Sequence, residues 1–220
     1  MFEKRINIFV GHYGSGKSEI AVNAAFGIKE NRENVVLADM DIVNPFFRSL
    51  DAKNWLESRG IRVLAPLFAN TNVDVPALVP EISVALRSPD KNVILDVGGD
   101  DDGARVLGRY VNDIEKDAYD MHFVINRARP LTGGVEETLQ YLEEIQAASR
   151  LRVTRLISNT HYLDQTSPGD VQYGLELTRQ VSEKTGIPVE FVCVMESMEH
   201  LAEGLDVPLF VLKKNIRLPF

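Results

Sequence analysis

The segment from Gly11 to Ser18, with the sequence GHYGSGKS, constrains the fold of this chain more than any other part of it. It matches G-x-x-x-x-G-K-[ST], the pattern of a phosphate-binding loop that joins a β-strand to an α-helix. The required context is present, because the apolar run Ile6–Val10 precedes the loop and the helix-forming run Lys17–Glu30 follows it. This context favours phosphate binding over the alternative, a glycine-rich turn with a solvated lysine.

The residue types in this loop suit the phosphates of a nucleotide. Glycines let the backbone turn tightly and bring main-chain N–H groups against phosphate oxygens. The N-terminus of the following helix adds unpaired N–H groups, Lys17 can reach the β and γ phosphates, and the Ser18 hydroxyl can ligate Mg²⁺. The nucleotide-binding residues predicted here are Gly11, Gly14, Ser15, Gly16, Lys17 and Ser18, with a catalytic role for Lys17 as well.

Apolar runs alternate with segments of helical period along the chain. The expected strands are Ile6–Val10, Val35–Ala38, Ile61–Ala65, Val93–Val97, His122–Asn126, Val153–Ser158 and Val189–Val194. The expected helices are Lys17–Glu30, Asn44–Arg59, Val135–Ser149 and Val171–Thr185. Several strands are apolar at every position, which is typical of parallel strands covered on both faces. With no linker or internal repeat, the sequence predicts one α/β domain over residues 1–220, with a doubly wound, mainly parallel sheet and helices on both faces.

Composition excludes several classes of protein. The chain has 220 residues, of which 45% are hydrophobic, and it contains no apolar run long enough to span a bilayer. Its single cysteine, Cys193, excludes an intrachain disulfide, and the apolar stretch before Gly11 is too short for a signal peptide. We therefore expect a cytoplasmic protein. The net charge of −8 provides no global basic field, so nucleic acid and membrane are disfavoured as partners.

A second nucleotide-binding element is predicted in the segment KNVILDVGG. The apolar run that begins at Val93 leads into Asp96, as in the Walker B element that helps to hold Mg²⁺. Gly98 and Gly99 follow, and the Gly99 backbone can approach the γ-phosphate. The alternative is an aspartate that ends a buried strand as a turn or helix-cap residue. The acidic run 100–102 is expected to cap the helix after it.

A third acidic element follows the strand that begins at Val35. Asp39 ends this strand and Asp41 comes two residues later, so both carboxylates can lie at the edge of the sheet where ligands bind in open α/β proteins. One can help to position Mg²⁺, and the other can orient an attacking water. The alternative is a turn aspartate together with a cap near Asn44 and Pro45.

The segments GHYGSGKS, LADMDIVN and ILDVGG, in this order and spacing, resemble the MinD/ParA/nitrogenase-iron-protein group of SIMIBI-class P-loop ATPases. The resemblance covers most of the chain. It implies a Mg²⁺-linked role for Asp39, a catalytic, water-orienting role for Asp41 and the Walker B role for Asp96. In that group the loop usually reads G-K-G-G-x-G-K-[ST], and its early lysine reaches the partner's nucleotide in an ATP-sandwich dimer. Here His12 and Tyr13 occupy the positions of that lysine and the next glycine.

The resemblance also suggests where the base would bind. This group contacts the base with residues after late strands, and Asn159 follows the expected strand Val153–Ser158. An amide can pair with the donor and acceptor edge of adenine, although a turn-forming asparagine explains this position nearly as well. Thr160 stands where the guanine pattern N-K-x-D has its lysine, which favours ATP. The four histidines are scattered, without metal-binding spacing, and we assign them no role.

These observations predict an ATP-binding protein that requires Mg²⁺, with Ser18, Asp39 and Asp96 around the metal. The leading hypothesis is an ATPase switch whose nucleotide state controls its binding to an unidentified protein partner, and a homodimer is possible. The alternative is a small-molecule kinase or an ATP-dependent ligase of the same class. The C-terminal segment LFVLKKNIRLPF is short for a membrane element and more readily closes the fold as a strand or a packed tail.

Overall fold

The computed structural model describes residues 1–41, 50–65, 80–99, 101–115 and 118–214. Its centre is one sheet of eight strands in the order β3-β2-β4-β1-β5-β6-β7-β8, and every neighbouring pair is parallel. The strands are β1 (Ile6–Val10), β2 (Val35–Asp39), β3 (Ile61–Leu64), β4 (Asn92–Asp96), β5 (Tyr119–Ile125), β6 (Arg155–Ser158), β7 (Val189–Met195) and β8 (Leu209–Leu212). All residues of β1 and β2 are buried, because helices cover both faces of the sheet.

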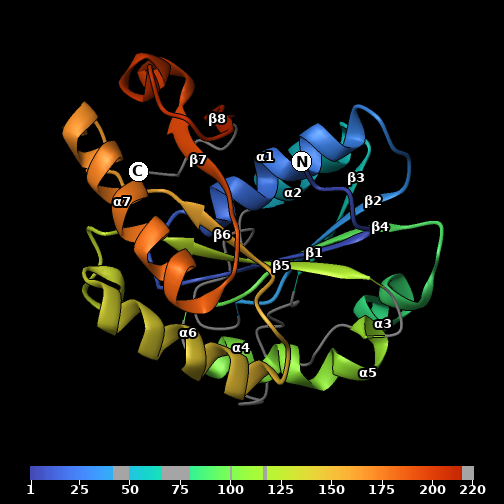
Figure 1. Cartoon of the computed structure of the whole chain (residues 1–220). Coiled ribbons are helices and arrows are strands. Elements are labelled where there is room, and N and C mark those ends of the chain that lie inside the picture. The colour runs from blue at the N-terminus through green and yellow to red at the C-terminus, as the bar shows by residue number, and fades with distance from the viewer. Residues whose placement is uncertain (42–49, 66–79, 100, 116–117, 215–220) are drawn as a thin grey trace.

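The helices form a layer on each face of the sheet (Figure 1), as the sequence predicts. They are α1 (Lys17–Lys29), α2 (Leu50–Glu57), α3 (Pro80–Arg87), α4 (Asp101–Leu107), α5 (Val111–Ile114), α6 (Val135–Ser149) and α7 (Pro168–Thr185), with short 3₁₀ helices η1 (Gly108–Tyr110), η2 (Pro130–Thr132) and η3 (Glu196–Ala202). Helices α1 and α2 lie on one face, and α3 to α6 lie on the other. The doubly wound α/β fold is therefore confirmed.

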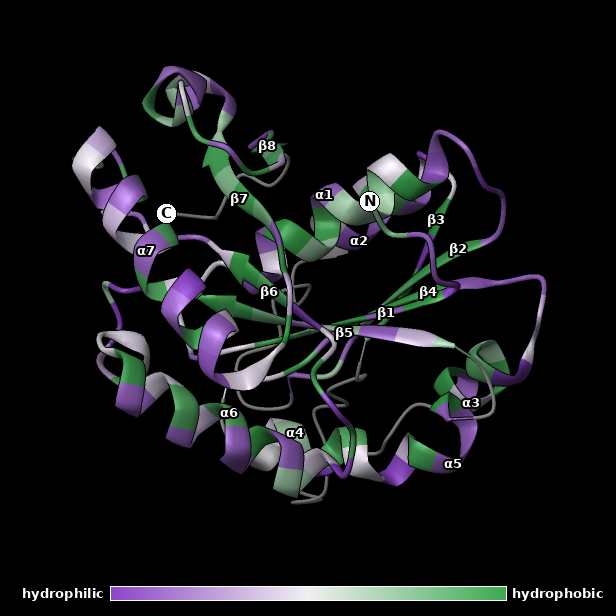
Figure 2. Cartoon of the chain, in the orientation of Figure 1, coloured by the Kyte–Doolittle hydropathy of each residue, from purple (hydrophilic) through white to green (hydrophobic). Residues whose placement is uncertain are grey.

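The hydrophobic core is divided by the sheet. One cluster packs α1 and α2 against Phe9 and the other side chains on that face, and a second packs α4 and α6 against residues such as Ile8 and Phe123. In Figure 2 the strands are mostly hydrophobic, while the outer sides of the helices are mostly hydrophilic. Among the described residues, no helix is both long and apolar enough to cross a membrane.

Several boundaries differ from those that the sequence predicts. Helix α7 begins at Pro168 rather than Val171, because Ser167 and Asp170 form a capping box that starts the helix earlier. Strand β5 begins at Tyr119, and its polar residue Asp120 is satisfied by a hydrogen bond from the Thr154 hydroxyl at 2.9 Å. The first turn of α7 and the start of β5 contain polar residues, so the apolar pattern of the sequence did not include them.

Other differences concern short elements and segments that adjoin residues outside the described ranges. The expected helix Asn44–Arg59 is described only from Leu50, where α2 begins, and residues 42–49 lie outside the described residues. Strand β6 begins two residues later than expected, at Arg155. At Thr154 the backbone N–H donates to the Met121 carbonyl at 2.9 Å, while the hydroxyl accepts from the Met121 N–H at 3.0 Å. Of the acidic run 100–102, residue 100 also lies outside, and helix α4 includes the other two aspartates, so their capping role stays a prediction.

Candidate nucleotide-binding site

The glycine-rich loop between β1 and α1 has the backbone of a concave anion site. Gly14 and Gly16 have φ angles of +72° and +89°, in the left-handed region that other residues rarely adopt. Gly16 is also the N-cap of α1, and no side chain caps this end of the helix. The N–H groups of the first turn therefore have no partner within the helix, and they point, with the positive end of the helix dipole, towards the loop.

Lys17, Ser18 and Asp96 meet beside this loop. Lys17 is 5% exposed and Asp96 is fully buried at the end of β4. Burial raises the pKa of Asp96 to about 6, while the Lys17 ammonium and the nearby Ser18 hydroxyl oppose this rise and the charge of Asp41 adds to it. Neither Asp96 oxygen has a hydrogen bond of normal geometry among the described residues. A buried carboxylate in this state needs a cation or a bound water.

The three aspartates predicted to act with the phosphates come together at one edge of the sheet. Asp39 and Asp96 are directly paired in the register of β2 and β4, so both lie at the carboxyl ends of adjacent strands. The Asp39 carboxylate accepts a hydrogen bond from the Asp41 N–H at 3.0 Å, which fixes the turn after β2. Asp41 is half-buried against Gly98. The segments Val35–Asp41 and Asn92–Gly98 are thus neighbours, as expected.

Gly99 brings the end of β4 against the phosphate loop itself. A Cβ atom on Gly99 would lie 2.5 Å from the Tyr13 nitrogen, so only glycine fits between these two backbones. The Tyr141 hydroxyl of α6 donates a hydrogen bond to the Gly99 carbonyl at 2.9 Å. This contact joins α6 to the segment that contains Gly98 and Gly99. Sequence analysis missed Tyr141, because only its buried position in α6 brings it here.

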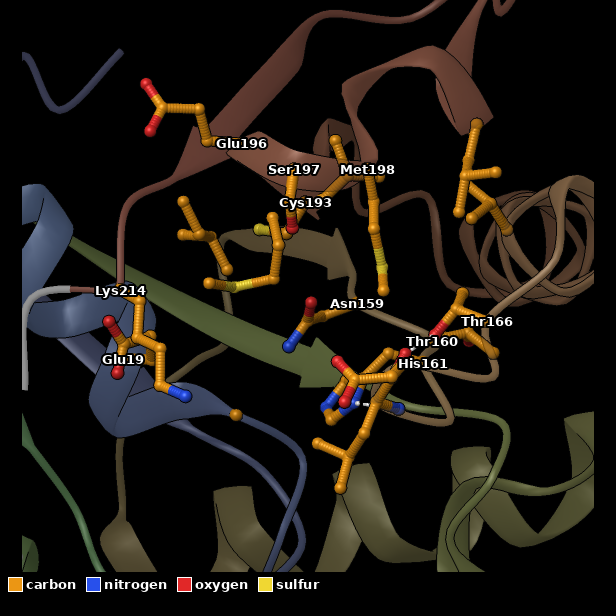
Figure 3. A pocket seen from close by; sticks show the side chains of 18 residues that line it. Glu19, Asn159, Thr160, His161, Thr166, Cys193, Glu196, Ser197, Met198 and Lys214 are labelled. Atoms are coloured by element: carbon orange, nitrogen blue, oxygen red, sulfur yellow. Dashed lines mark hydrogen bonds between the residues drawn. The ribbon is translucent and has the colours of Figure 1, made fainter. Parts of the chain in front are cut away.

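Asn159 links the phosphate loop to a neighbouring pocket. Its Nδ2 donates a hydrogen bond to the Ser15 carbonyl at 2.7 Å. Figure 3 shows the amide oxygen turned away from the loop and into the pocket, towards Cys193 and Met198. The pocket has a volume of about 1080 Å³. Its lining includes Gly16, Glu19, Asn159, Thr160, His161, Cys193, Ser197, Met198 and Lys214.

Two residues that were given no role lie at this site. Arg129, in the loop after β5, donates a hydrogen bond from Nε to the Gly14 carbonyl at 2.9 Å. His161 lines the pocket, and its pKa is lowered by burial and by the Arg129 charge, which favours the neutral imidazole. Neither residue belongs to a recognisable motif, so their positions follow only from the order of the strands. His122, by contrast, lies buried inside the sheet, with its ring against Phe2 and Phe9.

The residues fit a magnesium ion only if the nucleotide contributes ligands. Among the described residues, no group of three His, Cys, Asp or Glu side chains is arranged to hold a metal ion. The site does contain a hydroxyl ligand, Ser18, beside the unsatisfied carboxylate of Asp96. Mg²⁺ usually keeps several waters and binds through one or two protein groups together with substrate phosphates. The donor set here has that form.

Burial of Asp96 leads to a prediction about pH. Because its pKa in the folded protein is about 6, protons compete with Mg²⁺ as the pH falls through that value. We expect the Mg²⁺-dependent part of the nucleotide affinity to fall about tenfold between pH 7 and pH 5. In Asp96→Asn this inflection should be absent, although the affinity is lower throughout. Calorimetric titrations with MgCl₂ and with EDTA at each pH test this, and identical pH profiles in the two proteins would contradict it.

Comparisons with known proteins identify the fold class. No protein-family model and no curated protein sequence matches this chain. Similar solved structures include the cell division protein FtsY from Thermotoga maritima (22% identity, TM-score 0.57, covering 86% of this chain and 61% of that one). Another is the signal recognition particle receptor FtsY from Elizabethkingia anophelis in complex with GDP (20% identity, TM-score 0.56, covering 88% and 58%). A third is chloroplast FtsY from Physcomitrella patens (19% identity, TM-score 0.55, covering 85% and 57%).

These likenesses cover 85–88% of this chain, and at this level of identity they concern the fold alone. The chain spans about three fifths of the length of the FtsY proteins that it matches. Its fold is the doubly wound, single-sheet α/β fold of the P-loop NTPases. The matched structures do not show the particular resemblance to the MinD/ParA group.

Proposed function

We propose that this protein is a Mg²⁺-dependent ATPase of the SIMIBI class that acts as a nucleotide-controlled switch. One observation carries the proposal: a buried, unsatisfied carboxylate, Asp96, lies beside Lys17 and Ser18 at the open end of a glycine-rich anion loop. A buried carboxylate whose oxygens lack hydrogen bonds of normal geometry costs free energy, and the Lys17 charge offsets only part of this cost, since the pKa of Asp96 stays raised to about 6. A Mg²⁺–nucleotide complex supplies both the anion for the loop and the cation for the carboxylate.

Each residue of the site would have a defined task in hydrolysis. The loop N–H groups and Lys17 would bind the β and γ phosphates, and Ser18 would ligate Mg²⁺, with Asp39 and Asp96 positioning the metal through its waters. The bound Mg²⁺ would neutralise charge that develops on the phosphate oxygens. Asp41 would orient the attacking water, and the Gly99 backbone would approach the γ-phosphate. Most of the rate acceleration would come from positioning and electrostatics.

The choice of ATP rests on the pocket beside the loop. Asn159 Nδ2 uses one of its two N–H groups on the Ser15 carbonyl, and the amide oxygen points into the pocket as an acceptor. The exocyclic amino group of adenine can donate to this oxygen, but guanine has an amino group too, so the choice of ATP depends on the next position. Thr160 replaces the lysine of the guanine pattern, and its hydroxyl is occupied by a hydrogen bond from the Arg127 N–H at 3.0 Å.

This choice predicts a measurable preference for the base. We expect Mg²⁺–ATP to bind about tenfold or more tightly than Mg²⁺–GTP, because a mispaired polar group in a buried pocket costs roughly 1–3 kcal/mol. The wild-type protein would be titrated with both nucleotides, and phosphate release measured with each. Tighter binding of GTP would replace ATP in this proposal with GTP while leaving the phosphate site intact. Failure to bind either nucleotide would remove the proposal.

The alternative function, transfer of the γ-phosphoryl group to a small molecule, finds support in the size of the pocket. The pocket volume of about 1080 Å³ is slightly above the range of roughly 300–1,000 Å³ that is typical of small-molecule sites. The pocket therefore has room for a small-molecule acceptor. Slow phosphate release without any acceptor favours the switch. A second copy of this chain or an unidentified protein partner would then bind according to the nucleotide state. The proposed location is the cytoplasm.

A further inference from the structure

Among the described residues, the phosphate site contains few cations for the charge that it would hold. Lys17 is opposed by three aspartates at the same edge of the sheet, Asp39, Asp41 and Asp96, and the Lys17 charge already acts on Asp96. A nucleoside triphosphate adds further negative charge that a single Mg²⁺ does not neutralise. A second protein cation is therefore expected near the loop.

His12 does not supply this cation. It stands where a lysine occurs in the proteins that this loop resembles. Its Nδ1 is 2.8 Å from the Tyr13 carbonyl oxygen, so the ring is bonded back onto the loop. The ring also packs edge-on against Tyr141, with 5.8 Å between the centroids. Its short side chain is thus engaged on the α6 side of the loop.

Arg129 lies at the loop instead. A Cβ atom on Gly14 would lie 3.0 Å from Arg129 Nε and 3.3 Å from one of its terminal nitrogens, so the guanidinium rests directly on this glycine. The bond from Nε to the Gly14 carbonyl uses one donor, whereas a guanidinium has five. No acidic side chain among the described residues lies within ion-pair distance of Arg129. Within the described part of the chain, its terminal N–H groups therefore have no carboxylate to neutralise them.

The backbone around Arg129 is well anchored, so the guanidinium does not depend on a loose loop. The Arg129 N–H and the Thr132 hydroxyl both donate hydrogen bonds to the Asn126 carbonyl, at 3.0 and 2.6 Å. The Asn126 amide oxygen accepts from the Ala128 N–H at 3.0 Å, and Asn126 itself is fully buried at the end of β5. A long side chain fixed at its base loses less entropy on binding a ligand.

We propose that Arg129 is the second cation of the phosphate site: Nε fixes the Gly14 carbonyl, and the terminal N–H groups bind a phosphate oxygen of the nucleotide. The charge is then supplied by the same chain that holds the nucleotide, without a lysine from a second copy. This role rests on the proposed function as a nucleotide-binding protein. A Cβ atom at position 14 would crowd the guanidinium, in addition to the strain of a φ angle of +72°.

Three substitutions separate charge from shape. Arg129→Gln keeps an N–H donor for the Gly14 carbonyl but removes the charge, Arg129→Lys keeps the charge, and Arg129→Ala removes both. Arg127→Ala is the matched control, because Arg127 lies two residues away, is exposed, and stacks over Tyr173 at 5.4 Å instead of contacting the loop. Affinities for ATP and AMP with Mg²⁺, melting temperature and phosphate release per chain at several protein concentrations would be measured.

We expect Arg129→Gln and Arg129→Ala to bind ATP about tenfold to a hundredfold more weakly, as for the loss of charge-assisted hydrogen bonds, with little change for AMP. Arg129→Lys should recover part of this loss, and Arg127→Ala should bind as the wild type does. Release per chain should not rise with protein concentration. Wild-type affinity in Arg129→Gln, or an equal loss in Arg127→Ala, overturns this role alone. Absence of any nucleotide binding by the wild type overturns the proposed function with it.

Discussion

Replacement of Lys17 by alanine should abolish tight binding of ATP. Lys17 is the buried cation at the N-terminus of α1, and it would form charge-assisted hydrogen bonds with the β and γ phosphates. Their loss costs roughly 3 kcal/mol or more, which is about a hundredfold in affinity. Calorimetric titration with ATP and Mg²⁺ measures this effect directly.

The structure adds a second consequence of this substitution. Lys17 lowers the pKa of Asp96, so its removal leaves a buried carboxylate without its nearest cation. The pKa of Asp96 should rise further, and the domain should lose stability at neutral pH, because ionised Asp96 is then less favourable in the folded state. The melting temperature of Lys17→Ala should therefore recover as the pH is lowered towards 5.

Lys29→Ala provides a control in the same helix. Lys29 occupies the last turn of α1, at the end opposite to the loop, and its side chain approaches Gly60. This variant should bind ATP as the wild type does, with a similar melting temperature. Unchanged ATP affinity in Lys17→Ala would contradict the proposed phosphate site, whereas equal losses in both variants would indicate a general effect on α1.

The elements that sequence predicts well are those with a strong apolar pattern and clear ends. Strand β1 and helix α6 have the predicted bounds, and the first four residues of the C-terminal segment, Leu209–Leu212, form the edge strand β8. Helices α3 and α5 were missed, since eight and four residues carry too little periodicity to be distinguished from loops. Short elements depend on tertiary packing, which a local pattern does not record.

The candidate site shows the same division between local and spatial information. The phosphate loop and the two strand-end aspartates, Asp39 and Asp96, follow from local patterns, and the parallel sheet brings them together. Arg129 could not be predicted, because its contact with Gly14 joins residues 115 positions apart and depends on β5 lying next to β1. Asn159 was predicted as a base contact, and its bond to the Ser15 carbonyl was not.

Asp41→Asn should leave ATP binding nearly intact while lowering the rate of hydrolysis about a hundredfold, as expected for loss of a group that orients the attacking water. The change keeps the size of the side chain and the backbone N–H that donates to Asp39. It also removes a negative charge that raises the pKa of Asp96, so binding of Mg²⁺ should persist to a lower pH than in the wild type. The shift in pH dependence follows from the charge alone, whereas a simple turn residue would not lower the rate of hydrolysis.

The measurement combines phosphate release, ATP affinity and melting temperature for Asp41→Asn and for a control, Asp90→Asn. Asp90 is also an aspartate in a turn, but it precedes β4, at the end of that strand away from the phosphate loop. It accepts a hydrogen bond from Asn34 at 3.2 Å. Where an aspartate acts only in its turn, its replacement should cost about 1 kcal/mol of stability at most and leave turnover per folded molecule unchanged. If turnover falls in Asp41→Asn and not in Asp90→Asn, Asp41 acts at the γ-phosphate. If both variants keep wild-type turnover, Asp41 is a turn residue, and transfer to an acceptor or simple nucleotide binding becomes the better account of this site.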